Sequence, residues 1–394
     1  MRIGFEQNIL SGQRTGIGNY ALSLISALAE GSEDLEFLGS TPTGWSPVDL
    51  ARHGRCVSGE KRTWPYRQKT LNIMKNIPGA RQIRHRLKVA GFYFPRKSKK
   101  IDLFHAFNYV PPAHMGRTTI LPVVYDLSFI RYPDMHPTAR LRALSTLPKI
   151  VSEAPFVHTI SEFSKREIIE VLGYPSDQIL VAYPAPGSIY SPVGLFDAQP
   201  VLEAYGLTQA SFFLCVGTIE PRKNLKTVIA AYLRLSQTER SRFPLVIAGG
   251  SGWGVADFPD GTDRAVANGE IRFLGYVSDE ALSALYSSTT VFLFPSVYEG
   301  FGMPVVEAMA CGALVAHSKG TSMDEITGDL SIRLPALDVQ AWSDVMEQAM
   351  AIDLPMSFDL QDMRIARAKE FTWIKSANAV REVYRQLETN LQGL

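Results

Sequence analysis

The stretch "SFFLCVGTIEPRKNLKTVIAAYLRL", residues 211–235, contains a complete strand–loop–helix unit. Its first seven residues form an apolar run that ends in glycine, which is typical of a buried strand, and its second half repeats apolar residues at helical spacing. Asn224 stands at the start of this helix and is well suited to cap it. A buried strand that leads directly into a helix predicts a parallel sheet covered by helices.

The same alternation recurs along most of the chain. Further strands are expected within residues 1–7, 35–40, 102–107, 119–129, 157–161, 179–185, 244–250, 271–277 and 291–296. Helices are expected at residues 19–30 and 162–173, after Ser278 and near the C-terminus. Prolines and glycines interrupt this rhythm around residues 184–200, which predicts an interdomain linker. We therefore expect an α/β protein with two Rossmann-like, doubly wound parallel-sheet domains.

Length and composition agree with that organisation. A chain of 394 residues exceeds the usual size of one hydrophobic core, so two domains separated by a cleft are expected, although a TIM barrel also fits this length. The N-terminus lacks a signal-peptide pattern, and no long apolar stretch is free of charge. Three widely separated cysteines, Cys56, Cys215 and Cys311, indicate buried thiols rather than a zinc site. We expect a cytoplasmic protein.

Residues 61–100 form a basic segment. They contain 13 Lys or Arg and no Asp or Glu, whereas the whole chain has a net charge of +1. Aromatic and apolar residues are interspersed among the cations, a composition that suits an anionic membrane surface or an acceptor carrying phosphate. A solvated basic insertion is the alternative interpretation. No nucleic-acid recognition motif accompanies the charge, so a nucleic-acid partner is not expected.

Loops that follow strands of a parallel sheet are where ligands bind, and three of them stand out here. Arg222 and Lys223 stand side by side before a helix, where two cations, backbone N–H groups and the positive helix end suit a diphosphate. In "PSVYEGFGMPVVEAMACGALVAHS", residues 295–318, Glu299 and Glu307 are carboxylates suited to accept hydrogen bonds from hydroxyl groups.

The glycines of the second loop indicate a close approach to the ligand. Gly300 and Gly302 allow backbone amides to reach a ligand that a Cβ would hold away. Pro304 fits the first helical position and Gly312 the helix end. A diphosphate site beside two hydroxyl-binding carboxylates suggests a nucleotide sugar.

A third loop follows the first predicted strand and contains Gly16 and Gly18. These glycines would let a helix N-terminus approach a diphosphate, although a bare tight turn is the alternative. The spacing is not G-x-G-x-x-G, which disfavours a nicotinamide dehydrogenase.

Several motifs resemble the retaining GT-B glycosyltransferases of family GT4. They are "GTIEPRKNL" (217–225), "FLGYVSDEALSALY" (273–286), "ISEFSKREII" (160–169) and the E-x7-E spacing of Glu299 and Glu307 after "PSVY". The resemblance covers nearly the whole chain except residues 45–100. It implies two GT-B domains facing each other across a cleft: an acceptor-binding domain at 1–190 and a nucleotide-sugar-binding domain at 191–374. A C-terminal helix at 375–394 is expected to return to the first domain.

The resemblance also implies roles for particular residues. Glu307 would bind the ribose hydroxyls, Glu299 the hydroxyls of the transferred sugar, and Arg222 and Lys223 the diphosphate. The remaining donor contacts would come from the backbone amides of Gly300, Phe301 and Gly302, from Tyr276 or Val277 against the base, and from Gly16 or Gly18 at the phosphates.

One position departs from the family pattern. Similar proteins carry His-Asp where this chain has Tyr125 and Asp126, which moves the expected polar or acid–base role to Asp126. Tyr125 and His105 are then candidates on the acceptor side, although a single histidine is more often a structural residue.

The resulting hypothesis is retaining transfer of a sugar, with GDP-mannose as the expected donor, to a glycan or a polyprenyl-diphosphate-linked acceptor in surface polysaccharide synthesis. A front-side path is favoured because both glutamates are assigned to hydroxyls and no third carboxylate is placed for attack. No cofactor and no obligatory metal are expected, and the basic segment 61–100 would hold the protein peripherally at the inner face of the cytoplasmic membrane. A nucleotide-sugar epimerase and a catalytically degenerate nucleotide-sugar-binding protein are the alternatives.

Overall fold

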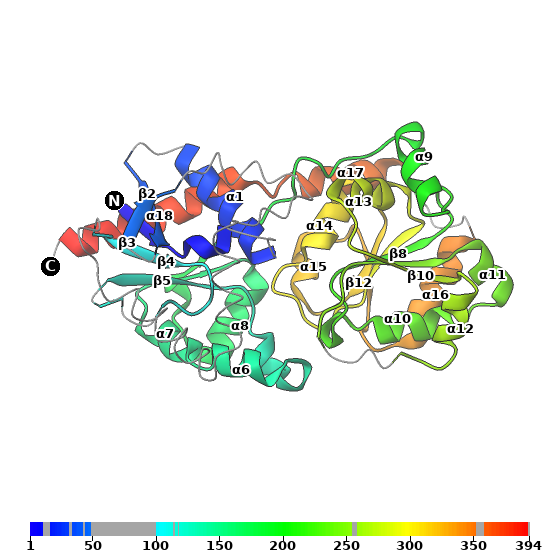
Figure 1. The fold of residues 1–394 in the computed structure, drawn as a ribbon, viewed down its shortest axis with the longest axis horizontal. Coiled ribbons are helices and arrows are strands. Elements are labelled where there is room, and N and C mark those ends of the chain that lie inside the picture. Colours follow the sequence, from blue (N-terminus) through cyan, green and yellow to red (C-terminus); the bar gives the residue numbers. More distant parts are fainter. Residues whose placement is uncertain are drawn as a thin grey trace, which may run out of the picture. The chain divides into compact units, whose positions relative to one another are not determined.

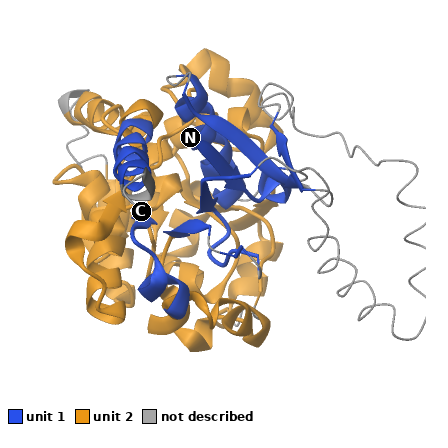
Figure 2. Ribbon diagram, turned by 90° about the vertical axis from the view of Figure 1, so that its left-hand side faces the viewer, with its two compact units in different colours: residues 1–123, 149–158, 377–394 blue, residues 124–148, 159–376 orange. Residues whose placement is uncertain are grey.

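The computed structural model describes residues 1–10, 16–30, 34–41, 44–48, 100–112, 115–116, 118–253, 258–351 and 358–392. The basic segment therefore lies outside the described residues, except for Lys100. The chain divides into two compact units (Figure 2). Unit 1 comprises residues 1–123, 149–158 and 377–394, and unit 2 comprises residues 124–148 and 159–376.

The first sheet has seven strands in the order β3-β2-β1-β4-β5-β6-β7. Strand β1 pairs in parallel with β2 and β4, and β4 with β5, whereas the edge strand β3 runs antiparallel to β2. The strands are β1 (Arg2–Phe5), β2 (Glu36–Thr41), β3 (Gly44–Pro47), β4 (Leu103–Ala106), β5 (Thr119–Val124), β6 (Val157–Thr159) and β7 (Ile179–Val181). The helices in this part of the chain are α1 (Gly16–Glu30), α5 (Ser128–Arg131), α6 (Thr138–Leu144), α7 (Leu147–Glu153) and α8 (Glu162–Leu172).

The second sheet has six strands in the order β10-β9-β8-β11-β12-β13, and its pairs are parallel. Figure 1 labels β8, β10 and β12 of this sheet. Its strands are β8 (Phe213–Val216), β9 (Leu245–Ala248), β10 (Ile271–Gly275), β11 (Val291–Phe294), β12 (Val315–Ser318) and β13 (Ile332–Leu334). The chain runs outward from β8 to β10 on one side, then returns to β11 and continues to β13 on the other. Strands β8 and β11 therefore flank the point where the strand order reverses, which is where open parallel sheets bind ligands.

Helices cover this second sheet and complete its core. They are α9 (Leu195–Ala204), α10 (Leu225–Tyr232), α11 (Gln237–Arg242), α12 (Thr262–Ala267), α13 (Asp279–Ser288), α14 (Met303–Ala310), α15 (Ser322–Thr327), α16 (Val339–Met350) and α17 (Phe358–Ala368). Val228 and Ile229 of α10 and Trp342 of α16 are fully buried against strand residues such as Leu245 and Val291. Burying a side chain of this size stabilises the fold by about 1.5–3 kcal/mol.

Two expectations about segment boundaries need correction. Helix α9 begins inside the stretch 184–200 that predicted a linker, and it contains Pro200. Its buried residues Ala198 and Leu202 lie on a helix that packs against α13, and this packing offsets the backbone hydrogen bond that proline cannot donate. Pro304 stands at the second rather than the first position of α14, whereas Gly312 follows the C-cap with a left-handed φ of +82°, as predicted.

The last helix, α18 (Trp373–Gln392), contributes residues 377–392 to unit 1. There Arg381 donates hydrogen bonds to the carbonyl oxygens of Ala27 and Leu28 in α1. Among the residues that the structure describes, no helix combines the length and the apolar character needed to cross a membrane.

Candidate functional site

The loops after β8 and β11 place oppositely charged side chains against each other. Lys223 Nζ lies 2.6 Å and Arg222 Nη1 lies 2.8 Å from Oε1 of Glu299. Both cations lie at the end of a short 3-10 helix, Pro221–Lys223, in the loop between β8 and α10. The reversal of strand order thus brings together three residues that the sequence assigned to one ligand.

Glu299 is held as an anion although it is buried. Burial acts to raise the pKa of this carboxyl, but the charges of Arg222 and Lys223 outweigh burial and lower the pKa to about 2. Burial also lowers the pKa of Lys223, and Glu299 opposes that shift. The two charges therefore depend on each other for their ionised state.

Arg222 also fixes the backbone of the second loop. Its guanidinium donates to the carbonyl oxygen of Tyr298 and to Oε1 of Glu220, each at 2.6 Å. In return, the backbone oxygen of Arg222 accepts from the N–H of Val297 at 3.0 Å. These bonds tie the loop after β8 to the loop after β11.

The glycine loop, residues 298–302, has backbone N–H groups without hydrogen-bond partners in the described part of the chain. The N–H groups of Gly300, Phe301 and Gly302 make no hydrogen bond to any described residue. Gly302 has a left-handed φ of +114° and immediately precedes helix α14. Successive free N–H groups at such a point form a concavity suited to anions and polar oxygens.

Gly300 is required by its surroundings. A Cβ at this position would lie 2.0 Å from the carbonyl oxygen of Tyr125 and 3.1 Å from Cβ of Asp126. Tyr125 and Asp126 thus lie in unit 2 against the glycine loop. The side chain of Asp126 accepts hydrogen bonds from the N–H and hydroxyl of Ser128, at 2.9 and 2.6 Å.

Glu307 has a different environment from Glu299. It lies on α14, and its nearest hydrogen-bond donor is the hydroxyl of Tyr286, 3.4 Å from Oε2. Burial, with a contribution from the charge of Asp279, raises the pKa of Glu307 to about 8. No cation pairs with this carboxyl in the described part of the chain, so its oxygens can accept hydrogen bonds from ligand hydroxyls.

The residues expected at the nucleotide base differ in exposure. The side chain of Tyr276 is 71% exposed, whereas Val277 is buried. Both follow β10 directly, on the same sheet as the charged cluster.

His105, Gly16 and Gly18 belong to unit 1. His105 is fully buried, and its ring nitrogens lie 2.7 Å from the Tyr384 hydroxyl and 2.8 Å from Nδ1 of His158. Burial lowers the pKa of His105, which keeps the ring neutral. This arrangement favours the structural role that the sequence left open over a place on the acceptor side. Gly16 begins α1 and Gly18 is buried within it.

Asn224 precedes α10, but it does not cap the helix through its side chain. Its amide instead donates to the carbonyl oxygens of Pro295 and Ala336, and its oxygen accepts from the Thr227 hydroxyl. Asn224 is thus the N-cap residue, as predicted, but its side chain makes no capping bond. The backbone of Asn224 has a left-handed φ of +53°. Its side chain links the segment after β11 to the segment after β13.

Two polar residues were not expected from the sequence. Ser322 donates its hydroxyl to the carbonyl oxygens of Glu299 and Phe301, at 2.9 and 2.6 Å. His136 is buried, and neither of its ring nitrogens has a hydrogen-bond partner in the described residues. Neither residue follows a predicted strand, so no sequence signal singled them out. The described residues contain no group of His, Cys, Asp and Glu side chains that could hold a metal ion.

Comparisons with known proteins identify relatives of this chain. The family model for glycosyl transferases group 1 matches residues 204–370. The O-antigen chain mannosyltransferase B of Escherichia coli is 32% identical over 399 residues, which cover 98% of this chain and 100% of that protein. The serotype-specific mannosyltransferase WbdA of Escherichia coli is 30% identical over 244 residues, or 59% of this chain and 29% of that protein.

Solved structures share the fold at low sequence identity. The sucrose-phosphate synthase of Thermosynechococcus elongatus superposes with a TM-score of 0.69 at 19% identity and covers 99% of both chains. HepE of Anabaena in complex with UDP-glucose gives a TM-score of 0.65 at 16% identity, over 100% of both chains. The fold is thus GT-B, with two α/β domains built on parallel sheets.

Proposed function

This chain belongs to the glycosyl transferases group 1 family, and we propose that it transfers mannose from GDP-mannose, with retained configuration, to a glycan in surface polysaccharide synthesis. The choice of sugar is supported by the O-antigen mannosyltransferase that matches nearly the full chain. A polyprenyl-diphosphate-linked glycan is the proposed acceptor.

One observation carries the proposal. Two cations, one buried carboxylate and three free backbone N–H groups meet beside the reversal of strand order, within unit 2. A nucleotide sugar presents the complementary groups, namely a diphosphate and several hydroxyls. In our proposal the diphosphate binds Arg222 and Lys223, and Glu299 then accepts hydrogen bonds from the hydroxyls of the sugar.

The environment of each carboxylate supports a separate role. Glu299, whose pKa is lowered to about 2 in the free protein, is ionised and would accept hydrogen bonds from the sugar. Glu307, on the next helix, would bind the ribose hydroxyls. Tyr276 and Val277 would lie against the base, and Gly16 and Gly18 would approach the phosphates.

Retention is proposed to follow a front-side path. A carboxylate with a pKa near 2 that shares an oxygen with two cations is a weak nucleophile, which disfavours a glycosyl-enzyme intermediate on Glu299. Catalysis would come mainly from Arg222, Lys223 and the loop amides, which stabilise the departing diphosphate. The leaving oxygen would take the proton of the acceptor hydroxyl. Asp126 would add a polar contact beside Gly300, and no metal is included.

The membrane proposal rests on sequence. Residues 61–99 lie outside the described residues. The 13 Lys or Arg of the segment 61–100 favour binding to an anionic surface near the acceptor. Flotation with neutral and anionic vesicles tests this proposal. Equal binding to both kinds of vesicle would remove its electrostatic basis.

A thermal-shift screen tests the donor. A ligand that binds only the folded protein raises its melting temperature. We expect a rise with GDP and GDP-mannose that exceeds the rise with UDP, ADP and their sugar conjugates. Transfer from GDP-mannose, with the anomeric configuration of the product read by NMR, completes the test. An inverted product would contradict retention, and the absence of any nucleotide effect would contradict the proposed function.

A further inference from the structure

The glycine loop after β11 is held through its carbonyl oxygens. The carbonyl of Tyr298 accepts from Arg222, that of Glu299 from Ser322, that of Gly300 from Ser161 and Ser164, and that of Phe301 from Ser322. Every one of these donors is a side chain. A peptide whose C=O is fixed on one side presents the N–H of the following residue on the opposite side. Fixing these carbonyls therefore orients the free N–H groups of residues 300–302.

Ser161 and Ser164, at the start of α8, bind the glycine loop through hydrogen bonds. The hydroxyl of Ser161 donates to the Gly300 carbonyl at 2.5 Å and accepts from the N–H of Ser164 at 2.9 Å, which makes it the N-cap of α8 as well. The Ser164 hydroxyl lies 3.1 Å from both the Gly300 and the Tyr125 carbonyl oxygens. Both serines are buried, so their hydroxyls are shielded from bulk solvent.

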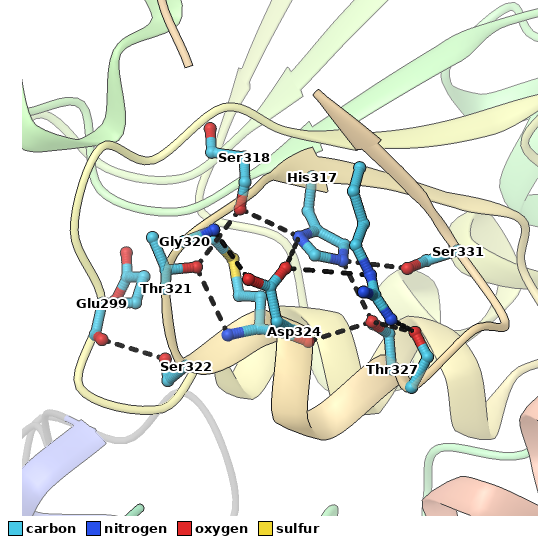
Figure 3. A network of polar contacts seen from close by, with 12 residues as sticks. Glu299, His317, Ser318, Gly320, Thr321, Ser322, Asp324, Thr327 and Ser331 are labelled. Carbon is cyan, nitrogen blue, oxygen red and sulfur yellow. Dashed lines mark hydrogen bonds and ion pairs between the residues drawn. The ribbon is translucent and has the colours of Figure 1, made fainter. Parts of the chain in front are cut away.

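Ser322 holds the other side of the loop and is itself well supported. It begins α15, whose preceding turn is closed by the N–H of Gly320 donating to Asp324 at 2.7 Å (Figure 3). Behind this turn, His317 is bonded at one nitrogen to the Ser318 carbonyl oxygen and at the other to the hydroxyls of Thr327 and Ser331. These bonds support the start of α15, where Ser322 lies.

Two further hydrogen bonds hold the side chain of Tyr298. Its hydroxyl accepts from the N–H of Leu127 and donates to Oε2 of Glu167, both at 3.2 Å. Glu167 in turn receives two hydrogen bonds from Arg131, at 2.8 and 2.9 Å. Tyr298 is thereby held at both its side chain and its carbonyl.

We propose that Ser161, Ser164 and Ser322 are positioning residues, whose hydroxyls bind the loop carbonyls so that the N–H groups of Gly300, Phe301 and Gly302 face the sugar and diphosphate of the donor. This inference rests on the proposed function for the identity of the ligand. The ordering of the loop itself does not depend on that function. A displacement of a reacting group by about 1 Å can cost roughly 10²-fold in rate, so small shifts of this loop are sufficient to lower turnover.

Hydrogen exchange and kinetics of matched variants test the proposal. The variants are Ser161→Ala, Ser161→Thr, which keeps the hydroxyl, and Ser164→Ala, which leaves the Ser161 cap in place. Ser236→Ala is the control, because Ser236 caps α11 in the same way and does not touch the loop. Exchange is followed in the peptide that covers residues 297–303, where the Val297 N–H, bonded to Arg222, is the protected reporter.

We expect faster exchange of this peptide in Ser161→Ala and Ser164→Ala, recovery in Ser161→Thr and no change in Ser236→Ala. With GDP-mannose, kcat should fall on the order of 10- to 10²-fold in the two alanine variants, whereas KM should change little because Glu307 still binds the ribose. Unchanged exchange in both alanine variants would overturn the inference. If the unaltered protein neither binds nor turns over a nucleotide sugar, the proposed function fails, while exchange still decides whether the hydroxyls order the loop.

Discussion

The ammonium group of Lys223 lies 2.6 Å from the carboxylate of Glu299, across the two loops that follow β8 and β11. The carboxylate is buried and shares the same oxygen with Arg222. In the free protein the carboxylate of Glu299 balances one of the two positive charges. A diphosphate would compete with Glu299 for the two cations and leave the carboxylate available to sugar hydroxyls.

We predict that Lys223→Met lowers turnover of GDP-mannose on the order of 10²–10³-fold, as observed when a single donor to a developing oxyanion is removed. Lys226→Met is the matched control, because Lys226 is exposed on α10 three residues further along. Steady-state kinetics of both variants provide the comparison. Near-normal turnover in Lys223→Met would show that Lys223 does not hold the diphosphate.

Arg222→Met should destabilise the protein more than Lys223→Met does. Its guanidinium pairs with the carboxylates of Glu299 and Glu220 and donates to the Tyr298 carbonyl oxygen. All three acceptors lose this donor in the variant. Removing one partner of a buried ion pair typically costs about 3–5 kcal/mol. Urea unfolding at neutral pH measures the difference, and equal stability of the two variants would contradict this account of Arg222.

Glu307 should make the stability of the protein fall as pH rises. Its pKa of about 8 in the folded protein lies above the ordinary glutamate value of 4.5. The folded state therefore holds the proton more tightly, so this contribution to stability is fully present below pH 4.5 and is lost as pH rises to about 8. Glu307→Gln, which stays neutral, should be more stable relative to the unaltered protein at pH 8.5 than at pH 5. Melting curves of both proteins at the two pH values check this, and a pH-independent difference would contradict it.

Nucleotide binding should release protons through the same group. Ribose hydroxyls donate to the ionised carboxylate and favour it, which lowers the pKa of Glu307 on binding. Calorimetry of GDP binding at pH 7, in buffers with different ionisation enthalpies, measures the released protons. We expect less release in Glu307→Gln together with weaker binding. The same release in both proteins would remove Glu307 from the ribose site.

Gly300→Ala should lower both stability and turnover. The added methyl would meet the Tyr125 carbonyl oxygen at 2.0 Å, and a backbone oxygen cannot move aside as a flexible side chain can. Gly194→Ala is the control, because a Cβ there meets no atom within 4 Å. Thermal melting and turnover of the two variants provide the test. A Gly300→Ala protein as stable and active as the control would contradict the close packing of Tyr125 on the loop.

The sequence by itself determined the class of fold and the chemistry of the loops. Alternation of apolar strands with amphipathic helices is a local property, and it is sufficient to predict two parallel-sheet domains. The rule that ligand loops gather at the carboxyl ends of parallel strands also predicted that Arg222, Lys223 and Glu299 share a site. Residue types and their spacing were sufficient for both conclusions.

Only the tertiary structure decided which atoms meet. Glu299 pairs with cations 76 and 77 positions earlier, and the Gly300 carbonyl accepts from Ser161, 139 positions earlier. The ring of His105 is hydrogen-bonded to Tyr384, 279 positions later in the chain. Periodicity and capping propensities report on neighbours within a few turns of chain. The pairing of distant side chains is fixed by the order of strands in the sheet and by the packing of the helices around it, which no local pattern encodes.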